Sequence, residues 1–505
     1  MMHKLSTSLA VALAAATLTA LPAAAQTASA GTATQSEDAR LTAFLDAAFE
    51  EYLARQPQLA TRLGLKQGGD RWNDTSEEAA RAEVEWRKAS VAKMRAAFDR
   101  AKLSPEAQVN FDIWALEAER AEVDFANRIY RPPFYSRLYS AHSQLPDFLV
   151  NTHTVADATD LRNYIARLRG MPALLDRAIE RTRASQEAGI KPPRFQIETV
   201  MTGSRKLISG APYGEGPDAA LWADVKAKTA ALVAAGKLPQ AEADTLLGEA
   251  RAAILALAPA YERVIAWAEA SLPDAPSGKV GALTLPGGDD YYAAQLKLVT
   301  TTDMTAQEIH AIGRAEVARI EAEQDALARQ AGLADRHAFY AERARLYPPR
   351  PFDDAARKEY LDESNAFVAR TRSLLGPWFG TLPAYGIEVV REPAFSEVAG
   401  GAAHASAPSP DGARPARTYV HLVGTVPDPA AKYTLMCHEA VPGHNMQGDI
   451  QVRQQGGPKF RSVTGYVAFG EGWALYAEAL CKEMGAFPDI AADFMRLDAE
   501  LFRAA

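Results

Sequence analysis

The chain has 505 residues, 48% of them apolar, and its 63 acidic and 55 basic residues give a net charge of −8. This apolar content excludes global disorder, and the acidic balance provides no basic surface for nucleic acid. Two cysteines are too few for a disulfide framework and cannot form a cysteine-type zinc site alone.

The first 25 residues have the pattern of a secretory signal peptide. Lys4 precedes a short apolar stretch over residues 9–21, and three alanines (23–25) precede Gln26. The stretch is too short for a stable transmembrane span, and no cysteine that could carry a lipid lies near the cleavage point. We therefore expect cleavage after Ala25, no membrane anchor, and a periplasmic or secreted product.

Helical patterns dominate after a small, polar lead-in over residues 26–37. Apolar residues recur at i, i+3 and i+4 spacing over residues 41–53, and this helix is expected to end before Pro57. Thr75 and Glu78 have the spacing of a capping box that opens a long helix rich in Ala, Glu and Arg.

Further helix signals follow downstream. Ser104 and Pro105 supply an N-cap and a first-turn proline, and Thr305 with Glu308 forms a second capping box. Long helical stretches are expected over residues 157–188, 218–270 and 305–330.

Two short stretches have the pattern of β-strands. Ile387 and Val389 alternate with Glu388, and residues 419–423 are rich in β-branched and aromatic side chains. The sequence therefore predicts a mainly α-helical fold with a small β-sheet near its C-terminal third.

A histidine-rich segment just after the second strand carries the clearest chemistry. The segment is Cys-His438-Glu439-Ala-Val-Pro-Gly-His444. Neutral imidazoles are good zinc ligands, and a glutamate next to one of them can act as a general base. The familiar H-E-x-x-H arrangement places its histidines on one helix face, whereas six-residue spacing leaves them about 120° apart. We predict that Pro442 and Gly443 break the helix and turn His444 back towards a metal.

A second acidic segment over residues 470–478 (GEGWALYAE) offers a third ligand. Glu471 and Glu478 are seven positions apart and share one face of a helix. Their apolar neighbours predict a buried helix, in which each carboxylate needs a metal, a histidine or an arginine as partner. The residues themselves leave open which of the two acids is the ligand.

The motifs HEAVPGHNMQ (438–447) and GEGWALYAE (470–478) together resemble the bacterial domain-of-unknown-function 885 family, which is grouped with zincin-type metallopeptidases. Blocks at residues 58–64, 146–149 and 291–308 extend the resemblance over nearly all of the mature chain. The resemblance implies a multi-helix, peptidase-like fold around a deep cleft, a peptide substrate and one zinc ion per chain.

The second motif is also similar to the N-E-G-F-A-x-Y-x-E segment of aminopeptidase N-type zinc enzymes. Carried over by position, this similarity makes Glu471 the third zinc ligand beside His438 and His444. It makes Glu439 the general base and Glu478 a supporting acid behind the ligands.

The resemblance also implies that the chain consists of two regions. We expect an N-terminal helical region over residues 38–290 and a catalytic region over residues 291–505, with the strand near 418–423 beside the bound substrate. Family members continue beyond a segment like residues 501–505, so the sequence is expected to be incomplete at its C-terminus.

Several other residues are candidates, each with a more ordinary alternative. Tyr466 and Tyr476 could donate a hydrogen bond to a developing oxyanion, although packing is the commoner role of a helical tyrosine. His421 could line the cleft, His404 could lie on a substrate loop and Arg461 could bind a peptide carboxylate; structural histidines and a surface salt bridge are the alternatives. The other internal histidines, at positions 142, 153, 310 and 337, are expected to be structural.

The two cysteines flank the two motifs. An oxidising compartment would permit a disulfide between Cys437 and Cys481, but no pattern fixes the separation that a disulfide needs, and two buried free thiols are the favoured interpretation.

Two other functions stay open beside a zinc metallopeptidase. One is a catalytically inactive periplasmic binding or scaffold protein on a metallopeptidase frame, and the other is a metal hydrolase of a different amide or ester. The sequence does not encode oligomeric state or substrate-end preference in any recognisable pattern.

Overall fold

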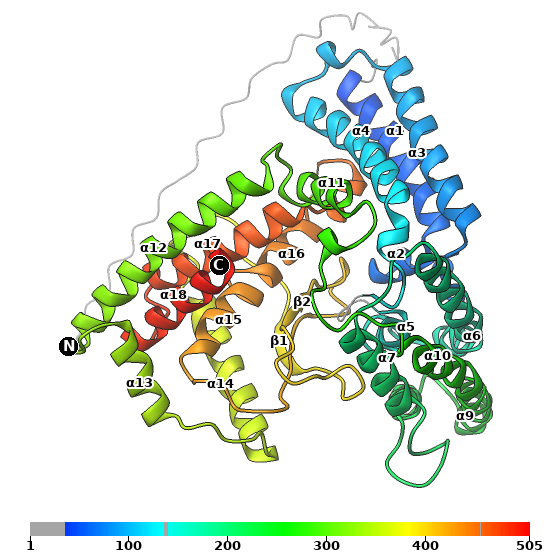
Figure 1. Ribbon diagram of the computed structural model, residues 1–505. Coiled ribbons are helices and arrows are strands. Elements are labelled where there is room, and N and C mark those ends of the chain that lie inside the picture. Colours follow the sequence, from blue (N-terminus) through cyan, green and yellow to red (C-terminus); the bar gives the residue numbers. More distant parts are fainter. Residues whose placement is uncertain (1–35, 136–139, 455) are drawn as a thin grey trace, which may run out of the picture. The chain divides into compact units, whose positions relative to one another are not determined.

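The computed structural model describes residues 36–135, 140–454 and 456–505 (Figure 1). The predicted signal peptide over residues 1–25, and all but the end of the predicted lead-in, lie outside these residues. Residues Glu37–Ala505 form one compact unit, so the boundary expected near residue 290 stays a prediction.

The first half of the described chain is built from helices. They are α1 (Glu37–Arg55), α2 (Pro57–Arg62), α3 (Glu77–Ala97), α4 (Pro105–Ala126), α5 (Ala141–Asp147), α6 (Ala158–Glu187), α7 (Arg194–Leu207), α8 (Ala220–Ala234), α9 (Gln240–Leu255), α10 (Ala258–Ser271) and α11 (Gly288–Thr300). Short 3-10 or π turns cover Arg100–Lys102, Arg128–Tyr130, Phe148–Thr152 and Ala282–Thr284.

Local signals explain where these helices begin. The Ser104 side chain accepts a hydrogen bond from the Ala107 amide and so caps α4, as predicted. The start of α3 differs by one residue from the prediction, because Ser76 rather than Thr75 is the N-cap and accepts from the Ala79 amide. The helical stretch expected over 218–270 consists of three helices, because Pro239 precedes α9 and Pro259 lies in the first turn of α10.

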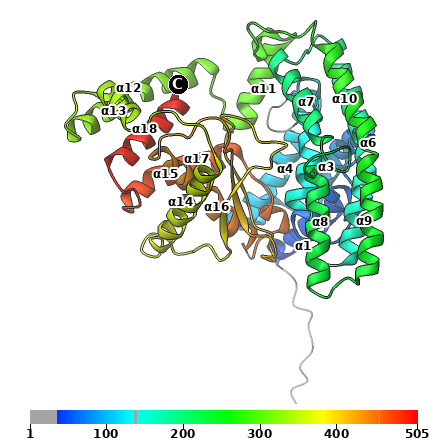
Figure 2. The ribbon, with the colours of Figure 1, turned by 90° about the horizontal axis from the view of Figure 1, so that it is seen from below.

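The second half contains α12 (Ala306–Gln330), α13 (Arg336–Leu346), α14 (Asp354–Ser373), α15 (Ala431–Glu439), α16 (His444–Val452), α17 (Val467–Glu483) and α18 (Ile490–Ala504), with a 3-10 turn at Lys459–Ser462. Thr305 and Glu308 form the predicted capping box of α12. Helices α12 and α18 lie side by side in both ribbon views (Figures 1 and 2). None of the described helices is long and apolar enough to cross a membrane.

Three strands form a small mixed sheet in the order β1-β3-β2. β1 (Ile387–Arg391) pairs parallel to β3 (Ala416–Val420), and β2 (His404–Ser406) pairs antiparallel to β3. Two details of the prediction were wrong: β3 ends at Val420, so His421 lies beyond it, and His404 lies on an edge strand rather than in a loop. The mainly helical fold with a small sheet is confirmed.

The sheet and helices α14 to α17 share one apolar core. It includes Val389 from β1, Val420 from β3, Met436 from α15, Met446 from α16 and Leu480 from α17, all buried. This core holds α15, α16 and α17 against each other, and these three helices carry the two sequence motifs.

Candidate metal centre

The helix that carries His438 ends before His444, as the proline and glycine predict. α15 ends at Glu439, the Val441–Pro442 peptide bond is cis, and α16 begins at His444. A side-chain carbon built on Gly443 would lie 1.8 Å from the carbonyl oxygen of His438, so only glycine fits this close turn. The Trp473 indole donates a 2.9 Å hydrogen bond to the Pro442 carbonyl and ties the break to α17.

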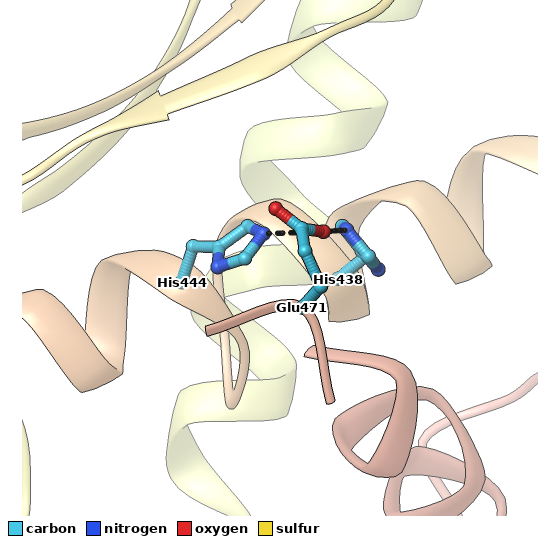
Figure 3. A group of neighbouring side chains, drawn as sticks. All are labelled: His438, His444 and Glu471. Atoms are coloured by element: carbon cyan, nitrogen blue, oxygen red, sulfur yellow. Dashed lines mark ion pairs between the residues drawn. The ribbon is translucent and has the colours of Figure 1, made fainter. Parts of the chain in front are cut away.

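The break brings the two imidazoles to the same carboxylate. Nε2 of His438 lies 3.4 Å from Oε2 of Glu471, and Nε2 of His444 lies 3.6 Å from the same oxygen. Figure 3 shows the Glu471 carboxylate between the two rings, whose planes are perpendicular. One ligand atom from each residue lies within 4.8 Å of the other two.

This donor set fits a zinc ion. Two atoms bound to one tetrahedral zinc ion at about 2.0–2.2 Å lie about 3.4 Å apart, close to the two histidine–glutamate separations of 3.4 and 3.6 Å. The set of two imidazoles and one carboxylate leaves a fourth position for water or substrate. Among the described residues, His438, His444 and Glu471 are the three potential ligands that lie close enough together to hold one metal ion.

Glu478 lies behind the candidate ligands. Its carboxylate is 1% exposed and accepts a 2.7 Å hydrogen bond from Nδ1 of His438. A carboxylate can only accept here, so Nδ1 carries the proton and Nε2 presents its lone pair towards Glu471. The Arg503 guanidinium contacts both oxygens of Glu478 and balances its charge.

Glu439 is buried beside these residues and lines the same cavity. Burial raises the pKa of its carboxyl to about 7, although the neighbouring His438 acts in the opposite direction. Burial opposes the charged form of His438, but its hydrogen bond to Glu478 and nearby carboxylates raise the pKa of that imidazole overall. Burial and the charge of His438 lower the pKa of His444.

Cys437 and Cys481 form a disulfide, so the expectation of two free thiols was wrong. Cys437 on α15 and Cys481 on α17 face each other in the apolar core, with their Cα atoms 6.4 Å apart. The bond joins the helix that carries His438 to the helix that carries Glu471 and Glu478.

The candidate ligands lie in the wall of a cavity of about 1490 Å³. Its wall also includes residues of α5, α7, β2, the segment after β1 and the segment before α17. The wall contains both polar groups and apolar side chains, among them Phe195, Phe395 and Phe469. A cavity of this volume is large enough to hold several residues of an extended chain.

Four other predicted candidates have clear positions relative to this cavity. Tyr466 lines it, and burial together with the nearby Glu117 carboxylate raises the pKa of its hydroxyl to about 12. His421 also lines it, and its Nδ1 accepts a 3.2 Å hydrogen bond from the Val398 amide. Arg461 lines it and donates to Asn110. Tyr476 is 53% exposed and lies outside the cavity wall.

Helix α17 is not buried all round, contrary to the prediction. Its inner face holds Ala474, Ala477 and Glu478, whereas Phe469 and Leu475 are exposed. The Glu471 side chain is 61% exposed, because it lies in the open cavity wall rather than in the core.

Sequence reasoning missed three residues of this region. Trp473 is one of the apolar neighbours of Glu471 and Glu478, and its indole also donates a hydrogen bond to the Pro442 carbonyl. Arg503 carries no local signal, because it meets Glu478 only through the packing of α18 on α17. Glu392, a buried acid after β1, lines the cavity through a segment without a motif of its own.

The chain matches one described family over most of its length. The family is "Bacterial protein of unknown function (DUF885)", and the match covers residues 57–505. No curated protein matches the chain.

Two solved structures have a similar fold. A "putative lipoprotein" from Colwellia psychrerythraea is similar over 93% of this chain and 82% of that chain, with a TM-score of 0.77 and 22% identity. A "putative lipoprotein of unknown function" from Shewanella oneidensis is similar over 91% of this chain and 81% of that chain, with a TM-score of 0.56 and 16% identity. At these identities the similarity shows the fold alone.

Proposed function

The chain belongs to the DUF885 family of bacterial proteins of unknown function, and we propose that it is an exported zinc-dependent metallopeptidase. The observation that carries this proposal is the convergence of His438, His444 and Glu471 on one point in the wall of a large cavity, with Glu439 beside them. His438, His444 and Glu471 would hold one zinc ion.

A bound zinc ion supplies Lewis-acid chemistry, which polarises a peptide carbonyl and makes water a stronger nucleophile. Glu439 then accepts a proton from the attacking water on a carboxylate oxygen as the oxygen–carbon bond forms. It passes this proton to the leaving amine nitrogen when the carbon–nitrogen bond breaks. The Tyr466 side chain lies in the cavity wall, and its hydroxyl would donate a hydrogen bond to the developing oxyanion.

Export is supported by two features of the chain. Residues 1–25 have the composition of a secretory signal peptide. The Cys437–Cys481 disulfide is typical of proteins that fold in an oxidising compartment.

The metal is tested first, by plasma mass spectrometry of the purified protein. We expect about one zinc per chain, lost in His444→Ala and kept in His310→Ala, which changes an exposed histidine on α12. Folded protein without bound metal would contradict the proposal.

The reaction is tested with a broad peptide panel. Glu439→Gln is expected to lower hydrolysis by about 10²–10⁴-fold while zinc content stays unchanged. Equal, near-zero activity in both proteins would favour the binding or scaffold protein instead. Turnover of esters or non-peptide amides, without peptide turnover, would favour the other hydrolase.

A further inference from the structure

Glu392 occupies an unusual position in the wall of the same cavity. It follows β1, it is 6% exposed, and its Oε1 accepts a 2.6 Å hydrogen bond from the Ser396 hydroxyl. Its Oε2 has no hydrogen-bond partner among the described residues. Nδ1 of His404 lies 3.9 Å from this oxygen, beyond hydrogen-bond reach.

Within the part of the chain that the structure describes, the charged groups nearest to this carboxylate are other carboxylates and an imidazole. Burial raises the pKa of Glu392 to about 7, and the charges of Asp147 and Glu397, which also line the cavity, act in the same direction. Glu397 is held by Arg391 and by the Leu422 amide, whereas no lysine or arginine among the described residues pairs with Glu392. Burial and the charge of His421 lower the pKa of His404, which keeps that imidazole neutral at pH 7.

We infer that Glu392 binds a cationic group of the substrate, an ammonium or a guanidinium, in the cavity whose wall also carries the candidate metal ligands. A buried carboxylate oxygen without a donor is costly, and a cation that enters the cavity supplies both the hydrogen bond and the compensating charge. Ser396 holds the other oxygen and orients the free one. Because this assigns a substrate group to the proposed peptidase, it rests on the proposed function.

Two sources of the cation are chemically equivalent, namely the free α-amine of a peptide and the side chain of lysine or arginine. The first would make the protein select peptide N-termini, and the second would make it select basic residues. Three peptide amides separate these sources: tri-alanine amide, its N-acetyl form, and an N-acetylated tripeptide amide in which one alanine is replaced by lysine.

Binding of these three peptides is measured by titration calorimetry in a Glu439→Gln background, so that they stay intact. We expect at least one cationic peptide to bind about tenfold or more tightly than neutral N-acetyl-tri-alanine amide. Glu392→Gln should abolish this preference. Glu198→Gln, a half-exposed carboxylate in the same cavity wall, should keep it. Ser396→Ala is a milder second variant and should reduce the preference.

Equal affinity for the three peptides, or a preference that survives in folded Glu392→Gln, would overturn the inference. Two zinc ions per chain, one of them lost in Glu392→Gln, would overturn it as well, because the cation would then be a metal. A protein that hydrolyses peptides but shows no preference dependent on Glu392 would refute this inference alone. A preference that depends on Glu392, in a protein that hydrolyses nothing, would refute only the peptidase.

Discussion

Nδ1 of His438 donates a 2.7 Å hydrogen bond to the buried carboxylate of Glu478. This contact fixes the proton on Nδ1 and aims Nε2 at Glu471, two helical turns earlier on α17. Two acids on one helix face thus contact opposite nitrogens of one imidazole, and they differ in exposure: Glu471 lies in the open cavity wall and Glu478 in the core.

Removal of the Glu478 carboxylate should weaken zinc binding without abolishing it. We expect Glu478→Ala to lower zinc affinity about 10–100-fold, because the imidazole loses the partner that orients it and raises its basicity. Competition with a chromogenic chelator measures this change. Glu483→Ala, on the exposed end of the same helix, is the matched control and should bind zinc like the unmodified protein. Unchanged affinity in both variants would mean that Glu478 has no role in metal binding.

The turn at Gly443 should not tolerate a side chain. In Gly443→Ala the new carbon would lie 1.8 Å from the His438 carbonyl oxygen, so the break between α15 and α16 must change shape and displace His444. We expect zinc to be lost from the purified variant, as measured by plasma mass spectrometry. Gly472→Ala has open space around the new carbon, and full zinc content is expected there. Full zinc content in Gly443→Ala would show that the site does not depend on this turn.

The disulfide should stabilise both the fold and the site. It closes a loop of 44 residues, and the chain-entropy model gives about 4 kcal/mol of unfolding free energy for a loop of this length. Urea unfolding with and without a phosphine reductant measures the effect. The double variant Cys437→Ala/Cys481→Ala should be less stable than the oxidised protein and insensitive to reductant. If the urea midpoint is the same with and without reductant, and the same in the double variant, the disulfide has no stabilising role.

Acid should destabilise the fold through a buried histidine near the cavity. Burial lowers the pKa of His142 from 6.5 to about 4, so between these values the unfolded chain binds a proton that the folded chain does not. The contribution of neutral His142 to stability is complete above pH 6.5 and declines as the pH falls towards 4.

This pH dependence can be measured by urea unfolding at pH 8 and at pH 5. From the two pKa values we expect His142 to account for about 2 kcal/mol of the stability lost at pH 5. In His142→Leu the loss between the two pH values should be smaller by about this amount. An identical loss in both proteins would show that His142 does not titrate in this way.

Short-range signals in the sequence were sufficient for several features. Ser104 and Thr305 mark helix starts because an N-cap depends on residues three positions away. Pro442 and Gly443 predict the break between the histidines because proline and glycine act on their own backbone. The seven-residue spacing places Glu471 and Glu478 on one helix face, and both contact His438.

Other features depend on contacts between distant segments. Only the packing of α15 against α17 decides that Glu471 faces both histidines while Glu478 lies behind one of them, and that Cys437 meets Cys481. Arg503 contacts Glu478 because α18 packs on α17. Glu392 lines the cavity because the segment after β1 lies near helices from other parts of the chain. The relative rotation of packed helices is set by many side chains at once, so no local pattern encodes it.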